Sequence, residues 1–196
     1  MSLLKSINDT AGRMSAIDRY SQTRLANPES VLEHTGWVCF CSLMIADELI
    51  ANGEHIDLGK LLSSATIHDV EEVIVGDIPS PTKYSSSNVT MGIKAFEDKA
   101  AKELLSSRMY GIWKEAKFGK EGFIVELADK LAVVYKIQQE TYEYGNNTLK
   151  GHVDNMIPVL NHLYDCQILD SIIDNHKIIT DIINEAIAIC NKVKAK

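Results

Sequence analysis

Apolar residues along this chain recur at steps of three and four and almost never alternate with polar ones. Side chains at steps of three and four share one face of an α-helix, whereas strict alternation marks a β-strand. One long repeat puts a single stripe on the face expected to meet the core: Val31, Thr35, Val38, Ser42, Ile45 and Leu49. Because strand patterns are nearly absent, the sequence predicts an all-α fold.

Capping residues, prolines and glycines predict where the helices begin and end. The pair Asn27–Pro28 is typical of a helix start, and Asn52–Gly53 is typical of a helix end. Asp57 is predicted to cap a second helix, which runs toward the doublet His68–Asp69. The remaining expected elements are a loop at 76–87, helices at about 88–110 and 121–144, and one or two closing helices at about 153–194.

The length and the charge of the chain limit the classes it can belong to. It has 196 residues, which fits one domain, and no linker or repeat divides it, so residues 1–196 are predicted to form a single domain. Its 27 acidic and 20 basic side chains give a formal net charge of -7. Because polynucleotide binding relies on lysine and arginine displacing counterions from phosphates, no nucleic-acid polymer is expected as a partner.

The apolar stretches and the cysteines indicate the compartment. The first residues lack the unbroken apolar stretch of a secretion signal. The longest apolar stretch, residues 37–46, is about half as long as the roughly 20 residues that span a bilayer. We therefore expect a cytoplasmic protein without a membrane partner. The four cysteines are predicted to be buried free thiols, as is usual in a reducing compartment: Cys39, Cys41, Cys166 and Cys190.

Polar side chains interrupt the apolar faces at three places. His34 lies on the core-facing side of its predicted helix, Asp129 lies between apolar residues at helical spacing, and His68–Asp69 closes the second helix. Burial of such groups is costly unless they are hydrogen-bonded or bind a metal, and together they could hold Mn²⁺, Fe²⁺, Co²⁺, Ni²⁺ or Zn²⁺. Alternatively, His34 is a core histidine bonded to a carbonyl, and Asp129 is a buried cap or pairs with Lys130 or Lys136.

The order His34, His68–Asp69, Asp129 resembles the signature of the HD-domain metal-dependent phosphohydrolases. The run HDVEEVIVGDIPSPTKY (68–84) closely resembles the bacterial and phage 5'-deoxynucleotidase branch, which is called YfbR-like. The segment IDRYSQTRLANPESVLEH (17–34) is similar to the part of that branch that leads into its first metal histidine. The resemblance covers about residues 10–150. It implies an HD-domain bundle of about six to eight helices, with the metal-site core at about 27–140 and closing helices at about 153–194.

The resemblance also implies the ligands and the role of a cofactor. One divalent ion, which could be Co²⁺, Mn²⁺, Zn²⁺, Mg²⁺, Ni²⁺ or Fe²⁺, would be bound by His34, His68, Asp69 and Asp129. It would activate a water molecule and contact a phosphate oxygen. Glu72 would orient that water or shuttle its proton. The alternative for Glu72 is a solvated carboxylate in an acidic run.

Further residues match the substrate side of the family site. Arg19 matches an arginine that holds the phosphate, and Arg24 and Lys83 are additional candidates for its negative charge. Asp77 matches an aspartate near the 3'-hydroxyl of the sugar, although it could simply form a turn. Tyr20 stands where the branch usually has a tryptophan that excludes a 2'-hydroxyl, so the preference for deoxyribose depends on a different ring here.

The function expected from these residues is 5'-deoxynucleotidase activity, which converts a deoxynucleoside monophosphate and water to a deoxynucleoside and phosphate. One alternative is a triphosphohydrolase that removes the whole triphosphate from a deoxynucleotide. Less favoured alternatives are a nucleotide-binding domain without activity and a guanosine-tetraphosphate hydrolase. The isoleucine-rich tail offers apolar surface beyond one stripe, so at least a homodimer is also expected.

Overall fold

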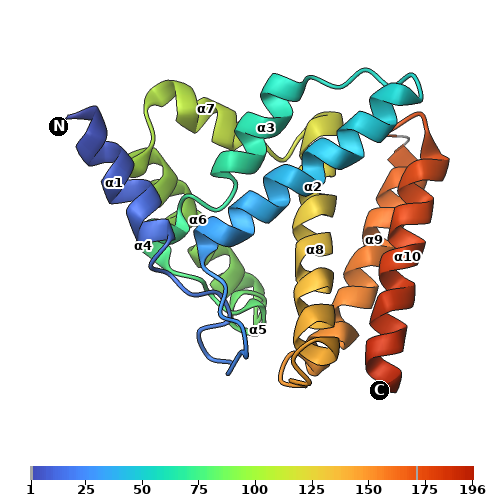
Figure 1. Ribbon diagram of the computed structural model, residues 1–196. Helices are drawn as coiled ribbons and strands as arrows, with labels where there is room; N and C mark the ends of the chain where they lie inside the picture. Colours follow the sequence, from blue (N-terminus) through green and yellow to red (C-terminus); the bar gives the residue numbers. More distant parts are fainter. Residues whose placement is uncertain (1, 171) are drawn as a thin grey trace.

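The computed structural model describes residues 2–170 and 172–196, and in this part every regular element is a helix (Figure 1). The predicted all-α class is therefore confirmed. Two short elements are α4 (Glu72–Val75) and α5 (Ser80–Lys83), and η1 (Lys150–His152) is a 3₁₀ turn. The longer helices are α1 (Leu3–Met14), α2 (Val31–Ala51), α3 (Leu58–Ile67), α6 (Ser87–Leu104), α7 (Ser107–Glu115), α8 (Gly119–Tyr142), α9 (Val153–Asp170) and α10 (His176–Ala195).

Two clusters of buried apolar side chains form the interior. The larger one joins α2, α3 and α8 to the antiparallel pair of α9 and α10, which lies at one side of the molecule (Figure 1). The smaller one lies beneath α1, α4, α6 and α7 at the other side. In α2 the two clusters are only two turns apart, because Val31 belongs to the smaller cluster and Val38 to the larger. His34 therefore lies at the boundary between them.

The ends of α2 and the start of α3 test the capping predictions. The predicted start of α2 at Asn27–Pro28 is wrong, because Ser30 caps the helix in a reciprocal pair with Glu33. The Ser30 N–H donates to Glu33 Oε2 at 2.7 Å, and the Glu33 N–H donates to Ser30 Oγ at 3.2 Å. The predicted end is confirmed, since Asn52 ends the helix and Gly53 has a φ of 91°. Asp57 caps α3 as predicted.

Three other elements differ from the prediction. The single helix expected at 88–110 is interrupted, because Leu105 is extended and Ser106 caps a new helix by accepting from the Met109 N–H. The predicted loop at 76–87 contains one helical turn, α5, after Pro79. Helix α1 was not expected at all; it is anchored by Arg13, whose Nη2 donates to the Val73 carbonyl at 2.6 Å.

The isoleucine-rich tail is buried only in part, since Ile168 is 45% exposed and Ile172 and Ile182 are partly buried. Ile173, Ile179 and Ile183 are fully buried in the larger cluster. One group of large exposed apolar side chains lies on the outer face of α2, where Phe40 is 63% exposed and Met44 is 59% exposed. The four cysteines are free as predicted, but only one of them, Cys190, is buried. Among the described residues, no helix combines the length and the apolar character needed to cross a membrane.

Candidate metal centre

The predicted metal ligands come from three helices that meet at the boundary of the two apolar clusters. The capped first turn of α2 fixes His34, which is 1% exposed. His68 and Asp69 follow the last turn of α3, and Asp129 lies in the middle of α8. His34, His68 and Asp129 each offer one ligand atom, and these atoms all lie within 4.8 Å of one another. The structure thus contains a possible metal site made of histidine and aspartate.

Asp69 lies beside this group of three. Its Oδ2 is 3.1 Å from His68 Nε2 and 3.7 Å from His34 Nε2. The same oxygen accepts a hydrogen bond from Arg19 Nη1 at 3.3 Å. Asp69 therefore faces both imidazoles, and it also pairs with the arginine predicted to bind phosphate.

Contacts behind the imidazoles orient them. His68 Nδ1 lies 2.7 Å from the carbonyl oxygen of Ala65, and a proton on Nδ1 leaves the lone pair of Nε2 facing the cluster. His34 Nδ1 lies 3.7 Å from Oε1 of the buried Glu29, while its Nε2 lies 3.0 Å from Asp129 Oδ1. The sequence did not predict this contact of Glu29, because Glu29 precedes α2 and helical periodicity says nothing about a side chain outside the helix.

Four polar atoms around the candidate ligands are buried and form no hydrogen bond: Arg19 Nε, the Tyr20 hydroxyl, His68 Nε2 and Glu72 Oε2. The contact of His68 Nε2 with Asp69 Oδ2 at 3.1 Å is an ion pair. Buried polar groups without partners are costly, so such a concentration indicates that another molecule or ion completes these contacts. Imidazole nitrogens and carboxylate oxygens are also the ligands that first-row divalent ions accept. The residues present therefore fit one divalent metal ion.

The charge distribution in the cluster favours a cation. Burial and the neighbouring Asp69 raise the pKa of Glu72 to about 9. Burial opposes protonation of His68, but Asp69 and Asp129 together raise its pKa to about 9. Lys130 and His34 hold the pKa of Asp129 well below its ordinary value, although burial acts in the other direction. The negative charge of the carboxylates is thus balanced by bound protons and by the ammonium group of Lys130. A divalent ion could supply this positive charge instead.

Three of the predicted substrate residues lie together at this site. Asp77 Oδ2 accepts a hydrogen bond from the Tyr20 N–H at 2.8 Å, and Arg19 Cζ lies 5.6 Å from the centre of the Tyr20 ring. Tyr20 has a φ of 57°, which is rare for a residue with a side chain and costs conformational energy. Its ring meets that of His152 edge to face at 5.9 Å. His152 belongs to η1 and was not predicted.

The other two predicted residues have different surroundings. Lys83 Nζ forms an ion pair with Glu97 Oε1 of α6 at 2.6 Å. The Arg24 side chain is exposed, and only its backbone carbonyl is bound, by Asn146 and Thr148. In the described part of the chain, neither side chain forms a hydrogen bond or ion pair with the candidate metal ligands.

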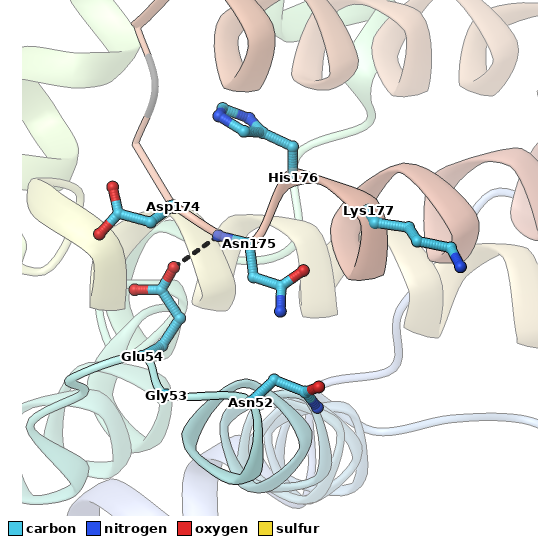
Figure 2. A pocket seen from close by; sticks show the side chains of 7 residues that line it. All are labelled: Asn52, Gly53, Glu54, Asp174, Asn175, His176 and Lys177. Carbon is cyan, nitrogen blue, oxygen red and sulfur yellow. Dashed lines mark hydrogen bonds between the residues drawn. The ribbon is translucent and has the colours of Figure 1, made fainter.

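A separate surface pocket lies between the end of α2 and the start of α10, with a volume of about 460 Å³ (Figure 2). It is lined by Asn52, Gly53, Glu54, Asp174, Asn175, His176 and Lys177. Glu54 accepts from the Asn175 N–H at 2.7 Å and pairs with Lys120 Nζ at 2.6 Å. Because α2 rises 1.5 Å per residue, Asn52 is roughly 27 Å from His34 along the helix. The pocket is therefore distinct from the candidate metal site.

An all-helical fold in which His34, His68 and Asp129 meet at a helix junction, with Asp69 beside them, is typical of the class of HD-type metal-dependent phosphohydrolases. Residues 8–170 match the family model of the YfbR-like 5'-deoxynucleotidases, and the chain belongs to this family. The family predicted from the sequence is therefore confirmed, together with its type of enzyme, a hydrolase of phosphate esters.

Individual relatives agree with the family match. A 5'-deoxynucleotidase of Vibrio vulnificus is 36% identical over 97 residues, which span about half of each chain (48% of this chain and 49% of the relative). A 5'-deoxynucleotidase of Salmonella arizonae is 33% identical over 70% of this chain and 73% of its own. The fold is similar to that of an HD phosphohydrolase of cyanophage S-2L, solved with dA and one catalytic Zn²⁺ ion; the TM-score is 0.62 at 14% identity, over 100% of this chain and 98% of that one.

Proposed function

We propose that this protein hydrolyses deoxynucleoside 5'-monophosphates with one divalent metal ion held by His34, His68, Asp69 and Asp129. The observation that carries this proposal is the set of unpartnered buried polar atoms on Arg19, Tyr20, His68 and Glu72, which surround the candidate ligands. They offer donors and acceptors for a metal, a phosphate, a water molecule and a sugar. The named activity of the relatives supports the same reaction.

The side chains divide the chemistry of phosphate hydrolysis between them. A bound divalent ion supplies charge for phosphate oxygens and lowers the pKa of a water molecule. Arg19, held by Asp69, presents a planar guanidinium that can hold two phosphate oxygens. Glu72 has one buried free oxygen and a raised pKa, so it is suited to hold a proton near neutral pH. Zn²⁺ is consistent with this nitrogen and oxygen ligand set and with the ion in the cyanophage structure.

Tyr20 and Asp77 are proposed to select the sugar. The hydrogen bond from the Tyr20 N–H occupies one oxygen of Asp77 and leaves the other for a sugar hydroxyl. The same bond supports the left-handed backbone of Tyr20, which directs the ring toward His152 and Arg19. A ribose would meet the Tyr20 ring, which is smaller than the tryptophan usual in the family, so discrimination against ribonucleotides is expected to be modest.

A substrate panel tests this function directly. The purified protein is incubated with the four deoxynucleoside monophosphates, the matching ribonucleotides and the deoxynucleoside triphosphates, each with Mn²⁺, Co²⁺, Mg²⁺ or Zn²⁺. We expect orthophosphate and nucleoside from the deoxynucleoside monophosphates in at least one metal. Release of intact triphosphate, detected by chromatography, would instead identify the triphosphohydrolase alternative. Absence of product with every substrate would contradict the proposal.

We also propose that the protein is a cytoplasmic homodimer that pairs through the outer face of α2. Trp37, Phe40 and Met44 are exposed there by 42%, 63% and 59%, and Leu32, Leu43 and Ile50 are about two-fifths exposed. At roughly 200 Å² for a fully exposed large side chain, the patch covers about 560 Å², which is near the upper end of the range for the largest apolar patch on a monomer. A stable dimer buries about 800 Å² on each partner. The apolar patch together with a surrounding rim of polar side chains would supply this area, so a second copy of the chain is the proposed partner.

Replacing Phe40 with glutamate is therefore expected to convert the dimer to a monomer. A charge in the centre of a paired apolar face would be buried without a partner. Light scattering at micromolar concentration measures the mass. Phe118→Glu is the matched control, because Phe118 is 68% exposed but lies outside the patch. A monomeric wild-type protein, or dissociation by both variants, would refute pairing through α2.

A further inference from the structure

Lys130 is a cation at the metal cluster that neither the family resemblance nor the proposed mechanism uses. Its Nζ lies 2.5 Å from Asp129 Oδ2, and its side chain is 26% exposed. Asp129 itself is 22% exposed, and its other oxygen, Oδ1, faces His34 Nε2 at 3.0 Å. The ammonium group thus lies on the side of the ligand carboxylate that is turned away from His34, and it remains in reach of solvent.

Arg19 and Lys130 each pair with one of the two aspartates, but on different sides: Arg19 contacts the Asp69 oxygen that faces the imidazoles, and Lys130 contacts the Asp129 oxygen that does not face His34. Arg19 pairs with Oδ2 of Asp69 at 3.3 Å, as Lys130 does with Oδ2 of Asp129. Among the described residues, these are the lysine and arginine side chains that form salt bridges with the proposed ligands. Each ligand carboxylate therefore has one monovalent cation on one oxygen, and the pair of cations borders the cluster.

A divalent ion at the cluster changes this balance. It would supply the positive charge that Asp129 now receives from the ammonium group, and two neighbouring cations repel each other. A lysine side chain has a flexible four-carbon stem and three rotatable donors, so it can turn to another acceptor. A phosphate monoester bound to that ion would carry close to two negative charges at neutral pH and would offer such an acceptor.

We propose that Lys130 is a second phosphate-binding residue, which turns from Asp129 to a phosphate oxygen when metal and substrate are bound. The inference rests on the proposed phosphohydrolase function and names a residue for it. Arg19 on the side of Asp69 and Lys130 on the side of Asp129 then hold the phosphate from two ligand carboxylates. Lys130 acts as a point charge, so it strengthens binding of the anion without fixing its orientation.

The test compares Lys130→Met with Lys130→Arg. Methionine keeps much of the side-chain length without the charge, and arginine keeps the charge. Lys114→Met is the matched control, because Lys114 also pairs with an aspartate, Asp98 at 2.7 Å, on the surface of α7. Each variant is saturated with Mn²⁺, and its dissociation constant for inorganic phosphate is measured by calorimetry. Equilibrium dialysis gives its affinity for Mn²⁺, and kinetics with dAMP give KM and kcat.

We expect Lys130→Met to raise the phosphate dissociation constant and the KM about tenfold, with kcat changed by no more than about threefold. Affinity for Mn²⁺ is expected to stay equal or to increase, because a competing ammonium group is gone. Lys130→Arg and Lys114→Met should resemble the wild type in phosphate binding. An unchanged phosphate dissociation constant in Lys130→Met would overturn the inference, whatever happens to Mn²⁺ binding. If Lys130→Met weakens phosphate binding but the wild type shows no nucleotidase activity, the role of Lys130 in phosphate binding stands and the proposed substrate is wrong.

Discussion

Replacement of Asp129 with alanine is expected to abolish stable metal binding and to lower kcat/KM for deoxynucleoside monophosphates about a thousandfold or more. The change removes the oxygen 3.0 Å from His34 Nε2 and leaves Lys130 without its partner at 2.5 Å. An unpaired ammonium group beside the cluster would then repel any divalent ion. Metal catalysis supplies several kcal/mol of transition-state stabilisation, and each 1.36 kcal/mol is a factor of ten in rate.

Two measurements follow this prediction. Elemental analysis after dialysis gives the metal content of the wild type and of Asp129→Ala, and steady-state kinetics give kcat/KM. Asp154→Ala is the control, because Asp154 also pairs with a lysine, Lys194 at 2.5 Å, on the surface. It should keep full metal content and activity. A stoichiometric metal in Asp129→Ala, with activity within about tenfold of the wild type, would remove Asp129 from the ligand set.

The second large effect is expected in stability, from Glu140 near the end of α8. Glu140 is fully buried, and its carboxylate accepts hydrogen bonds from the N–H groups of Ala26 at 2.8 Å and Asn27 at 2.9 Å. Lys136 Nζ lies 3.7 Å away and also donates to the Asn27 carbonyl, and Asn146 donates to Glu140 as well. This network attaches the segment between the Arg19–Tyr20 pair and α2 to α8.

Glu140→Ala is expected to lower the free energy of unfolding by about 3 to 5 kcal/mol, because it leaves Lys136 buried without its partner and two backbone N–H groups unsatisfied. Urea titration measures the loss, and the exposed Glu143→Ala at the end of the same helix should change stability by less than about 0.5 kcal/mol. A loss below about 1 kcal/mol in Glu140→Ala would show that the network contributes little.

The effect of Glu140 should also depend on pH. Burial opposes its ionisation, but the hydrogen bonds from Ala26 and Asn27 hold its pKa below the ordinary value. A carboxyl group with a lowered folded-state pKa stabilises the fold above its unfolded pKa of about 4.3, and this contribution is lost as the pH falls. The difference in stability between the wild type and Glu140→Ala is therefore expected to shrink below about pH 4.

The candidate metal ligands are visible in the sequence because they break a local rule. A histidine or an aspartate on an apolar helical face is visible from spacing within one helix, which is how His34 and Asp129 were found. Spacing alone does not decide between a metal ligand and a buried ion pair, and the ion pair of Asp129 with Lys130 is present within the candidate metal site. Asp57 and Asn52 were equally visible, because a helix cap is a local signal.

The features that the sequence did not predict depend on contacts between distant segments, or on which of two possible capping residues begins a helix. Glu140 meets residues that lie 113 and 114 positions earlier in the chain, and nothing in α8 alone distinguishes it from a solvated glutamate. The start of α2 was misplaced because both Asn27 and Ser30 can cap a helix, and only the reciprocal pair with Glu33 decides between them. Which isoleucines of the tail are buried also depends on distant packing: Ile179 and Ile183 lie in the larger cluster, whereas Ile168 is 45% exposed.

The candidate metal site lies between the two apolar clusters, and this position has a consequence for stability. His34 and Asp129 are 95 residues apart in sequence, and His68–Asp69 lies between them. An ion shared by these residues would be a reversible cross-link that ties three distant segments of the chain, as a disulfide ties two. Unlike a disulfide, this link exists only in the folded chain, so the resistance of the fold to unfolding would rise and fall with the concentration of free metal.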